Sequence, residues 1–205
     1  SREKKTVQPM RQVNLLVDIQ AKLQAGKGAG YERWAKVFNL KQLSQAVLYL
    51  KEHGDMSYAE LEERSAAATT KFNELSAEIK DLETQMTANG ELQKQIVNYA
   101  KTRAVYVDYR KAGYSRKFKE AHEADILIHQ AAKKYFDELG IKKLPSVKSL
   151  REEYAGLLAQ KRTAYAAYKR AREDMKELYN VKSNVEHLLE IDERGQAPDR
   201  EKARQ

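Results

Sequence analysis

The sequence predicts an all-α protein: a long antiparallel helical hairpin of the coiled-coil type, with a short basic helix at the tip and N-terminal helices packed at the free ends. Apolar residues recur at alternating steps of three and four over two long stretches, as in helices that pack knobs into holes. Of the 205 residues, 33% are charged and 41% hydrophobic, a balance that suits narrow buried seams rather than a thick core. Only nine glycines and three prolines interrupt the chain.

Residues 1–54 are predicted to form the N-terminal helices. The first helix runs from about residue 7 to 25 and ends at the glycines of GKGAG. One or two helices follow and close at Gly54, with two apolar faces made by Tyr31, Trp34 and Phe38 and by Leu40, Leu43, Val47 and Leu50. GKGAG follows a helix and lacks the spacing of a phosphate-binding loop, so a linker or helix boundary is the better interpretation.

The hairpin is predicted to span residues 55–191, and its first long helix begins where Ser57 and Glu60 have the form of a capping box. Its seam follows helical spacing through Leu61, Ser65, Ala68, Phe72, Leu75, Ile79, Leu82, Met86, Asn89, Leu92, Ile96, Tyr99, Arg103 and Tyr106. Two successive steps of three at Asn89 and Gly90 predict a bend. A full break is the alternative, since glycine is unfavourable inside a helix.

A short helix over residues 115–139 is predicted to connect the two long ones, with Gly113 as the preceding C-cap and Ser115 as its N-cap. Its apolar residues include Phe118, Ile128, Tyr135 and Leu139. After IKKLP, Ser146 opens the last helix. The heptad seam of that helix is Leu150, Tyr154, Leu157, Lys161, Ala164, Tyr168, Ala171, Met175, Leu178, Lys182, Val185 and Leu189. The seams could pair within one chain or between two, and residues 192–205 should be disordered.

Positive charge is concentrated in one quarter of the chain. Residues 99–151 hold 13 Lys and Arg against 6 Asp and Glu, whereas residues 1–98 hold 14 against 13 and residues 152–205 hold 11 against 11. The basic tip, residues 99–151, therefore carries +7 of the net charge of +8. Such clustering is typical of an electrostatic binding surface.

Cations and aromatic rings alternate in the part of this tip between residues 99 and 119. The candidate DNA-binding residues are Lys101, Arg103, Tyr109, Arg110, Lys111, Tyr114, Arg116, Lys117 and Lys119. Cations neutralise phosphates and tyrosine rings stack on unpaired bases, so the composition suits single-stranded or hairpin DNA. Two alternatives stay open: a solvated face with Tyr99 and Tyr106 in the seam, and a surface for an acidic protein.

Other chemistry finds little support in the residues. His122, Asp125 and His129 share one helical stripe and could help to bind a metal, but a metal site needs three or four convergent ligands, so packed histidines are the better interpretation. The chain has no cysteine, and its carboxylate pairs lie in solvated helical stretches without a pocket. We therefore expect no enzyme activity, no metal and no cofactor.

No apolar run approaches the roughly 20 residues that a membrane-spanning helix needs. The opening segment has no secretory pattern either. We expect a soluble, cytoplasmic protein that does not insert into membranes. Since the chain begins with Ser1, it could be a piece of a longer protein.

Four long phrases resemble the C-terminal helical region of relaxases, the mobilisation nucleases of conjugative transposons in Firmicutes. They are GKGAGYERWAKVFNLKQ, IVNYAKTRAVYVDYRKAGYSRKF, HEADILIHQAAKKYFDELGIKKLPSVKSL and YAAYKRAREDMKEL, and the likeness covers most of residues 11–190. The resemblance implies a region downstream of a nuclease domain that nicks one strand at a transfer origin. In that family the nuclease carries a nucleophilic tyrosine and a metal-binding histidine cluster. This chain has no H-x-H pair, so none of those catalytic residues can be carried over.

The sequence thus favours a non-catalytic accessory region of a conjugative relaxase, which contacts DNA at a transfer origin or docks conjugative transfer proteins. The alternative is a structural coiled-coil module that binds a protein partner and no DNA.

Overall fold

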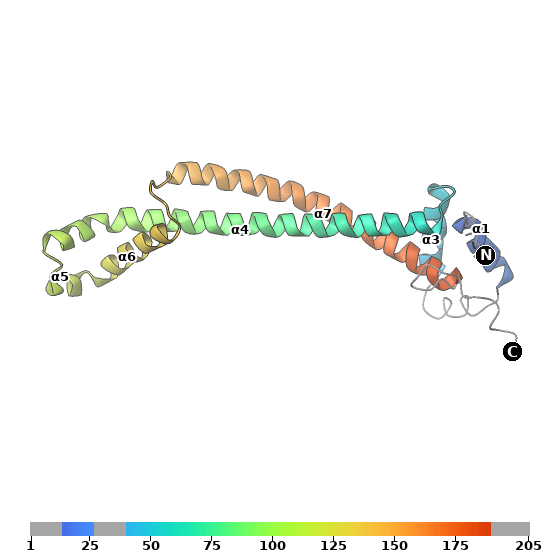
Figure 1. The fold of residues 1–205 in the computed structure, drawn as a ribbon, viewed down its shortest axis with the longest axis horizontal. Coiled ribbons are helices and arrows are strands. Elements are labelled where there is room, and N and C mark those ends of the chain that lie inside the picture. Colours follow the sequence, from blue (N-terminus) through green and yellow to red (C-terminus); the bar gives the residue numbers. More distant parts are fainter. Residues whose placement is uncertain (1–13, 27–39, 190–205) are drawn as a thin grey trace, which may run out of the picture. The chain divides into compact units, whose positions relative to one another are not determined.

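The computed structural model describes residues 14–26 and 40–189, and every regular element in these two ranges is an α-helix (Figure 1). The all-α class is confirmed. The helices are α1 (Leu15–Ala25), α3 (Leu40–Glu52), α4 (Tyr58–Lys111), α5 (Arg116–Ala121), α6 (Glu123–Glu138) and α7 (Val147–Leu189). Predictions for residues 7–13, most of GKGAG, the ring face of Tyr31, Trp34 and Phe38, and the tail 192–205 lie outside the described residues.

The chain divides into two compact units, and the division passes through both long helices. The terminal unit contains residues 14–26, 40–74 and 168–189, and the central unit contains residues 75–167. In the terminal unit, α1 and α3 share one apolar core with the start of α4 and the end of α7.

The terminal unit has the thicker core of the two. Its most deeply buried apolar side chains come from four helices: Leu15, Ile19, Leu50, Leu61, Val181, Val185 and Leu188. The Tyr58 hydroxyl donates a hydrogen bond to Glu186 at 2.6 Å and thereby ties α4 to α7. Burial, together with the carboxylate of Glu186, raises the pKa of Tyr58, so this hydroxyl keeps its proton.

The start of α4 is held by the predicted capping box. The backbone N–H of Ser57 donates to the Glu60 carboxylate at 2.8 Å, and the backbone N–H of Glu60 donates to Ser57 Oγ at 3.2 Å. The helix then continues through Asn89 and Gly90 to Lys111, so a full break at Gly90 is wrong. Next to Gly90, the side-chain amide of Asn89 donates a hydrogen bond to α7.

In the central unit, α4 and α7 are antiparallel, because residues later in α4 contact residues earlier in α7. The Asn89 side-chain amide donates to the carbonyl oxygen of Leu150 at 3.0 Å, and Lys161 forms an ion pair with Glu83 at 2.7 Å. A small apolar cluster lies on both sides of the Glu83–Lys161 ion pair. It consists of Leu82, Leu157 and Ala164, with Ile79 and Met86 packed against it.

Burial on α7 follows one half of the predicted heptad seam. Every seventh residue is buried, namely Leu150, Leu157, Ala164, Ala171, Leu178 and Val185. The intervening seam residues are half-buried, and Tyr154 is exposed. Near the end of α7, Val181, Asn184 and Leu188 are buried as well, although they lie outside the predicted seam. The reason is that this part of the helix also shares a core with α1 and α3.

Candidate nucleic-acid interface

The corner between α4 and α5 carries most of the predicted site and is built by two capping motifs. Gly113 has φ +63° and its N–H donates to the Arg110 carbonyl at 3.0 Å, while the N–H of Tyr114 donates to the Tyr109 carbonyl at 3.0 Å. These two bonds close the end of α4 as in a Schellman motif. Ser115 accepts from the N–H of Phe118 at 3.5 Å and caps α5. Both predicted caps are confirmed.

The single helix predicted over residues 115–139 is wrong, because the structure has two helices there. His122 leaves the helical conformation with φ −131° and separates α5 from α6. The break lets Phe118 of α5 stack on Tyr109 while α6 packs along the end of α4. Neither glycine nor proline lies at this point, so tertiary contacts rather than local propensity explain the break.

A stack of rings fastens α6 to the end of α4. His129 lies between Tyr99 and Tyr106, with its ring centroid 4.3 Å from each of theirs, and it is 3% exposed. Its Nδ1 lies 3.0 Å from the hydroxyl of Thr102. Thr102 is buried in the seam, whereas Arg103, which the sequence placed there, is exposed. The register therefore differs by one residue from the prediction at this point.

Burial lowers the pKa of His129, and the nearby charge of Lys133 lowers it further, although a hydrogen bond to the Tyr99 backbone acts in the opposite direction. The ring is therefore neutral at pH 7. In the unfolded chain the same ring would titrate near its ordinary value of about 6.5.

We predict that the protein loses stability as the pH falls below about 6.5, because the unfolded state binds a proton at His129 before the folded state does. The loss is complete once the pH has passed the lowered pKa of the folded state. Urea unfolding of wild type, His129→Gln and the exposed control His122→Gln at several pH values between 7.5 and 5 measures it. Replacement of His129 should flatten the profile, and an unchanged profile in that variant would contradict the prediction.

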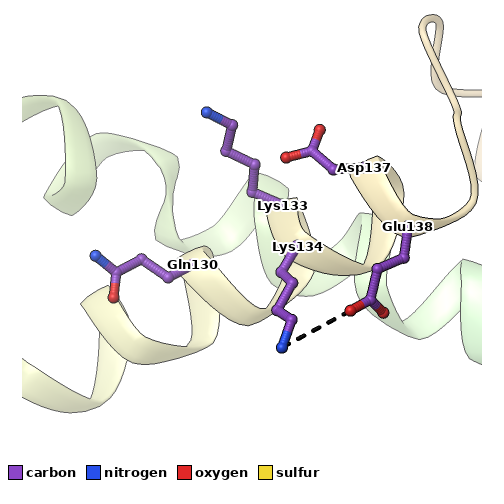
Figure 2. A pocket seen from close by; sticks show the side chains of 5 residues that line it. All are labelled: Gln130, Lys133, Lys134, Asp137 and Glu138. Atoms are coloured by element: carbon purple, nitrogen blue, oxygen red, sulfur yellow. Dashed lines mark ion pairs between the residues drawn. The ribbon is translucent and has the colours of Figure 1, made fainter.

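The metal alternative is not supported by the positions of its three ligands. His122 and Asp125 are exposed while His129 is buried in the ring stack, so the three do not converge. Within the two described ranges, no group of three His, Cys, Asp or Glu side chains could hold an ion. The shallow depression on α6 shown in Figure 2 is lined by Gln130, Lys133, Lys134, Asp137 and Glu138, all from one helix.

Five of the candidate cations lie in the last turn of α4 or in α5, on either side of the corner, and the other two lie further back on α4. We call the positive residues of the segment 101–119 the basic cap: Lys101, Arg103, Arg110, Lys111, Arg116, Lys117 and Lys119. All are exposed except the half-buried Lys119. Lys111 lies 3.9 Å from Asp108 and Arg116 lies 2.8 Å from Glu120, but both pairs are solvent-exposed and weak. These cations can therefore exchange their carboxylates for phosphates at little cost.

The two candidate tyrosines beside the basic cap differ in their exposure to solvent. Tyr109 is 7% exposed and packs against the rings of Tyr106, Tyr114 and Phe118, so it supports the corner and presents no free ring face. Its predicted role in stacking is therefore corrected to a structural one. Tyr114 is 55% exposed and has φ +58°, a left-handed conformation that is costly for an aromatic residue. It is the ring that the corner presents to solvent.

The structure also divides the predicted basic tip by charge. The segment 101–119 has seven cations and one carboxylate, whereas α6 has two lysines and four carboxylates. Four more cations follow in residues 142–151. The excess of positive charge over residues 99–151 therefore comes from two separate segments, 101–119 and 142–151, and α6 between them is acidic.

Comparison with models of known protein families, with curated proteins and with solved structures gives no match. Among the helices of the described ranges, none combines the length and the apolar character needed to cross a bilayer. The cytoplasmic location stays a prediction.

Proposed function

We propose that this chain is a non-catalytic accessory region that contacts DNA through the basic cap and so assists mobilisation in a conjugative relaxase. The observation that carries the proposal is the cap itself, in which five of the seven cations stand on either side of a corner that presents Tyr114, against the two carboxylates Asp108 and Glu120. The resemblance to the region downstream of relaxase nucleases supports it. No strand cleavage is assigned to this chain, because the relaxase catalytic set has no counterpart in its sequence.

The chemistry of the cap suits DNA that contains unpaired bases. Arg110 and Lys111 precede the corner, and Arg116 and Lys117 follow it, so phosphates on either side of Tyr114 would find a cation. An exposed tyrosine ring can stack on a base only where that base is unpaired. The substrate class we propose is therefore single-stranded DNA or the loop of a DNA hairpin.

We also propose that α4 and α7 form one antiparallel coiled coil within a single chain, which carries the cap. In the central unit the pairs 89–150 and 83–161 run in opposite directions, and in the terminal unit Phe72 contacts Tyr168 and Tyr58 bonds Glu186 in the same sense. Such a coil serves as a support for the cap rather than as a binding site.

The alternative function is a protein-interaction module that binds no DNA. It is favoured by an exposed apolar surface on α6, which includes Leu127 and Ile128. The two functions differ in one measurable property, affinity for DNA at low salt.

A titration of fluorescent DNA tests the proposal. Wild-type protein should bind a hairpin with an unpaired loop more tightly than a blunt duplex, and affinity should fall steeply between about 50 and 200 mM salt because bound phosphates release counterions. Tyr114→Gly should weaken hairpin binding roughly tenfold and spare the duplex, since stacking contributes roughly 1 to 3 kcal/mol per base. Glycine also suits the left-handed backbone at this position, so the fold is kept.

Tyr154→Ala is the matched control, because Tyr154 is another exposed tyrosine of the central unit but lies outside the cap. It should leave both affinities unchanged. If wild-type protein shows no measurable affinity for either DNA at low salt, the proposal fails and the interaction module takes its place.

A further inference from the structure

Helix α6 has two apolar faces, and only one of them is buried. The buried face consists of Ile126, His129, Ala132 and Phe136, which pack in the central unit. The sequence had suggested Ile128 and Leu139 as apolar residues of this helix, but both are exposed. They belong to the second face.

The second face is continuous along the helix. It consists of Ala124, Leu127, Ile128, Ala131, Tyr135 and Leu139. Apart from the adjacent pair Leu127 and Ile128, successive members are three or four residues apart, so they share one side of the helix. Leu127 is 50% exposed, Ile128 40% and Leu139 54%, the two alanines are exposed, and Tyr135 is half-buried. Single exposed apolar residues are common on protein surfaces, whereas a contiguous stripe marks an interaction site.

Carboxylates border this stripe. Glu123 and Asp125 flank Ala124 at one end, and Glu138 precedes Leu139 at the other. Lys134 lies 3.7 Å from Glu138, so these two charges partly offset each other (Figure 2). With four carboxylates against Lys133 and Lys134, α6 still has a net negative charge in a chain whose net charge is +8.

We propose that the second face of α6 is a docking site for an amphipathic helix of another protein whose apolar stripe is flanked by lysine or arginine. The exposed aliphatic side chains would enter the groove between turns of the partner helix, as in other helix-to-helix recognition. The bordering carboxylates would select a basic partner over an acidic one, because like charges at the edge of an interface oppose binding.

The same carboxylates argue against other classes of partner. Nucleic acid and anionic membrane surfaces carry negative charge, which α6 repels while the basic cap attracts it. The proposal is therefore independent of DNA binding by the cap, and each can fail without the other.

A peptide titration tests the site. The probe is a fluorescent helical peptide of roughly 18 residues with a leucine stripe flanked by lysines, and its counterpart has glutamate in place of each lysine. We expect the basic peptide to bind wild-type protein, with an affinity that falls at high salt, and the acidic peptide not to bind. In Leu127→Gln/Ile128→Gln, the affinity for the basic peptide should fall about tenfold or more, because two anchoring side chains are lost.

Two controls make the outcome decisive. Gln130 lies on the polar face of the same helix, so Gln130→Ala should bind the basic peptide as tightly as wild type does. Circular dichroism should show the same helix content for all variants. Equal binding of both peptides, or an unchanged affinity in the double variant, would overturn the proposal. Dimerisation of the wild-type protein in sedimentation that is lost in the double variant would assign the face to a second copy of this chain and overturn it as well.

Discussion

Reversal of four cations of the basic cap should reduce DNA affinity by about a hundredfold or more at roughly 100 mM salt, because each lost phosphate contact also removes the release of a counterion. The variant is Arg110→Glu/Lys111→Glu/Arg116→Glu/Lys117→Glu, and the measurement is a titration of hairpin DNA. The fold should persist. Glutamate disfavours the last turn of α4 but favours the first turn of α5, so the two effects on the helix ends largely offset each other.

A control with the same change in net charge separates the cap from the general positive charge of the protein. Lys80, Lys94, Lys148 and Arg162 are exposed cations of the central unit outside the cap. Their reversal to glutamate should lower the affinity much less than reversal in the cap. Equal losses in the two variants would mean that DNA is attracted by net charge and that the cap is not a site.

Leu157→Asp should destabilise the protein by at least about 3 kcal/mol, since it places a carboxylate in the apolar cluster between α4 and α7. Urea unfolding followed by circular dichroism measures the change. Because we propose that the two helices pair within one chain, the wild-type midpoint should not depend on protein concentration.

Ala159→Asp is the control for Leu157→Asp, because it adds the same side chain at an exposed position two residues further along α7. Its effect should be within about 0.5 kcal/mol. A wild-type midpoint that rises with protein concentration would show that the seams pair between chains. A small change in the free energy of unfolding on Leu157→Asp would contradict the proposed pairing of α4 with α7.

Strong local signals predicted the elements correctly. The capping box of Ser57 and Glu60 and Gly113 as a C-cap each depend on residues close in sequence, and both are found in the structure. Of the heptad seam predicted for α7, one residue in every seven is buried. The all-α class follows from the same periodicity.

The errors arose where distant contacts override local preference. The break at His122 occurs without glycine or proline because α5 and α6 pack on different parts of α4. Thr102 replaces Arg103 in the seam because it meets His129, which is 27 residues away. Spacing alone also could not distinguish Tyr109, which is enclosed by rings, from the exposed Tyr114.

The charge pattern of the central unit limits how much DNA one cap can hold. The cap has seven cations. The neighbouring helix α6, which contacts α5, is acidic and opposes further contacts with DNA phosphates. The slope of log affinity against log salt is therefore at most about six for duplex DNA. A contact of this size binds weakly at physiological salt, with dissociation constants of about 10⁻⁴ to 10⁻⁶ M when no sequence is read. The fraction of caps that are bound therefore depends on the local concentration of DNA. A second attachment of the same protein to the same DNA raises that concentration, because it keeps the cap close to its target after each dissociation.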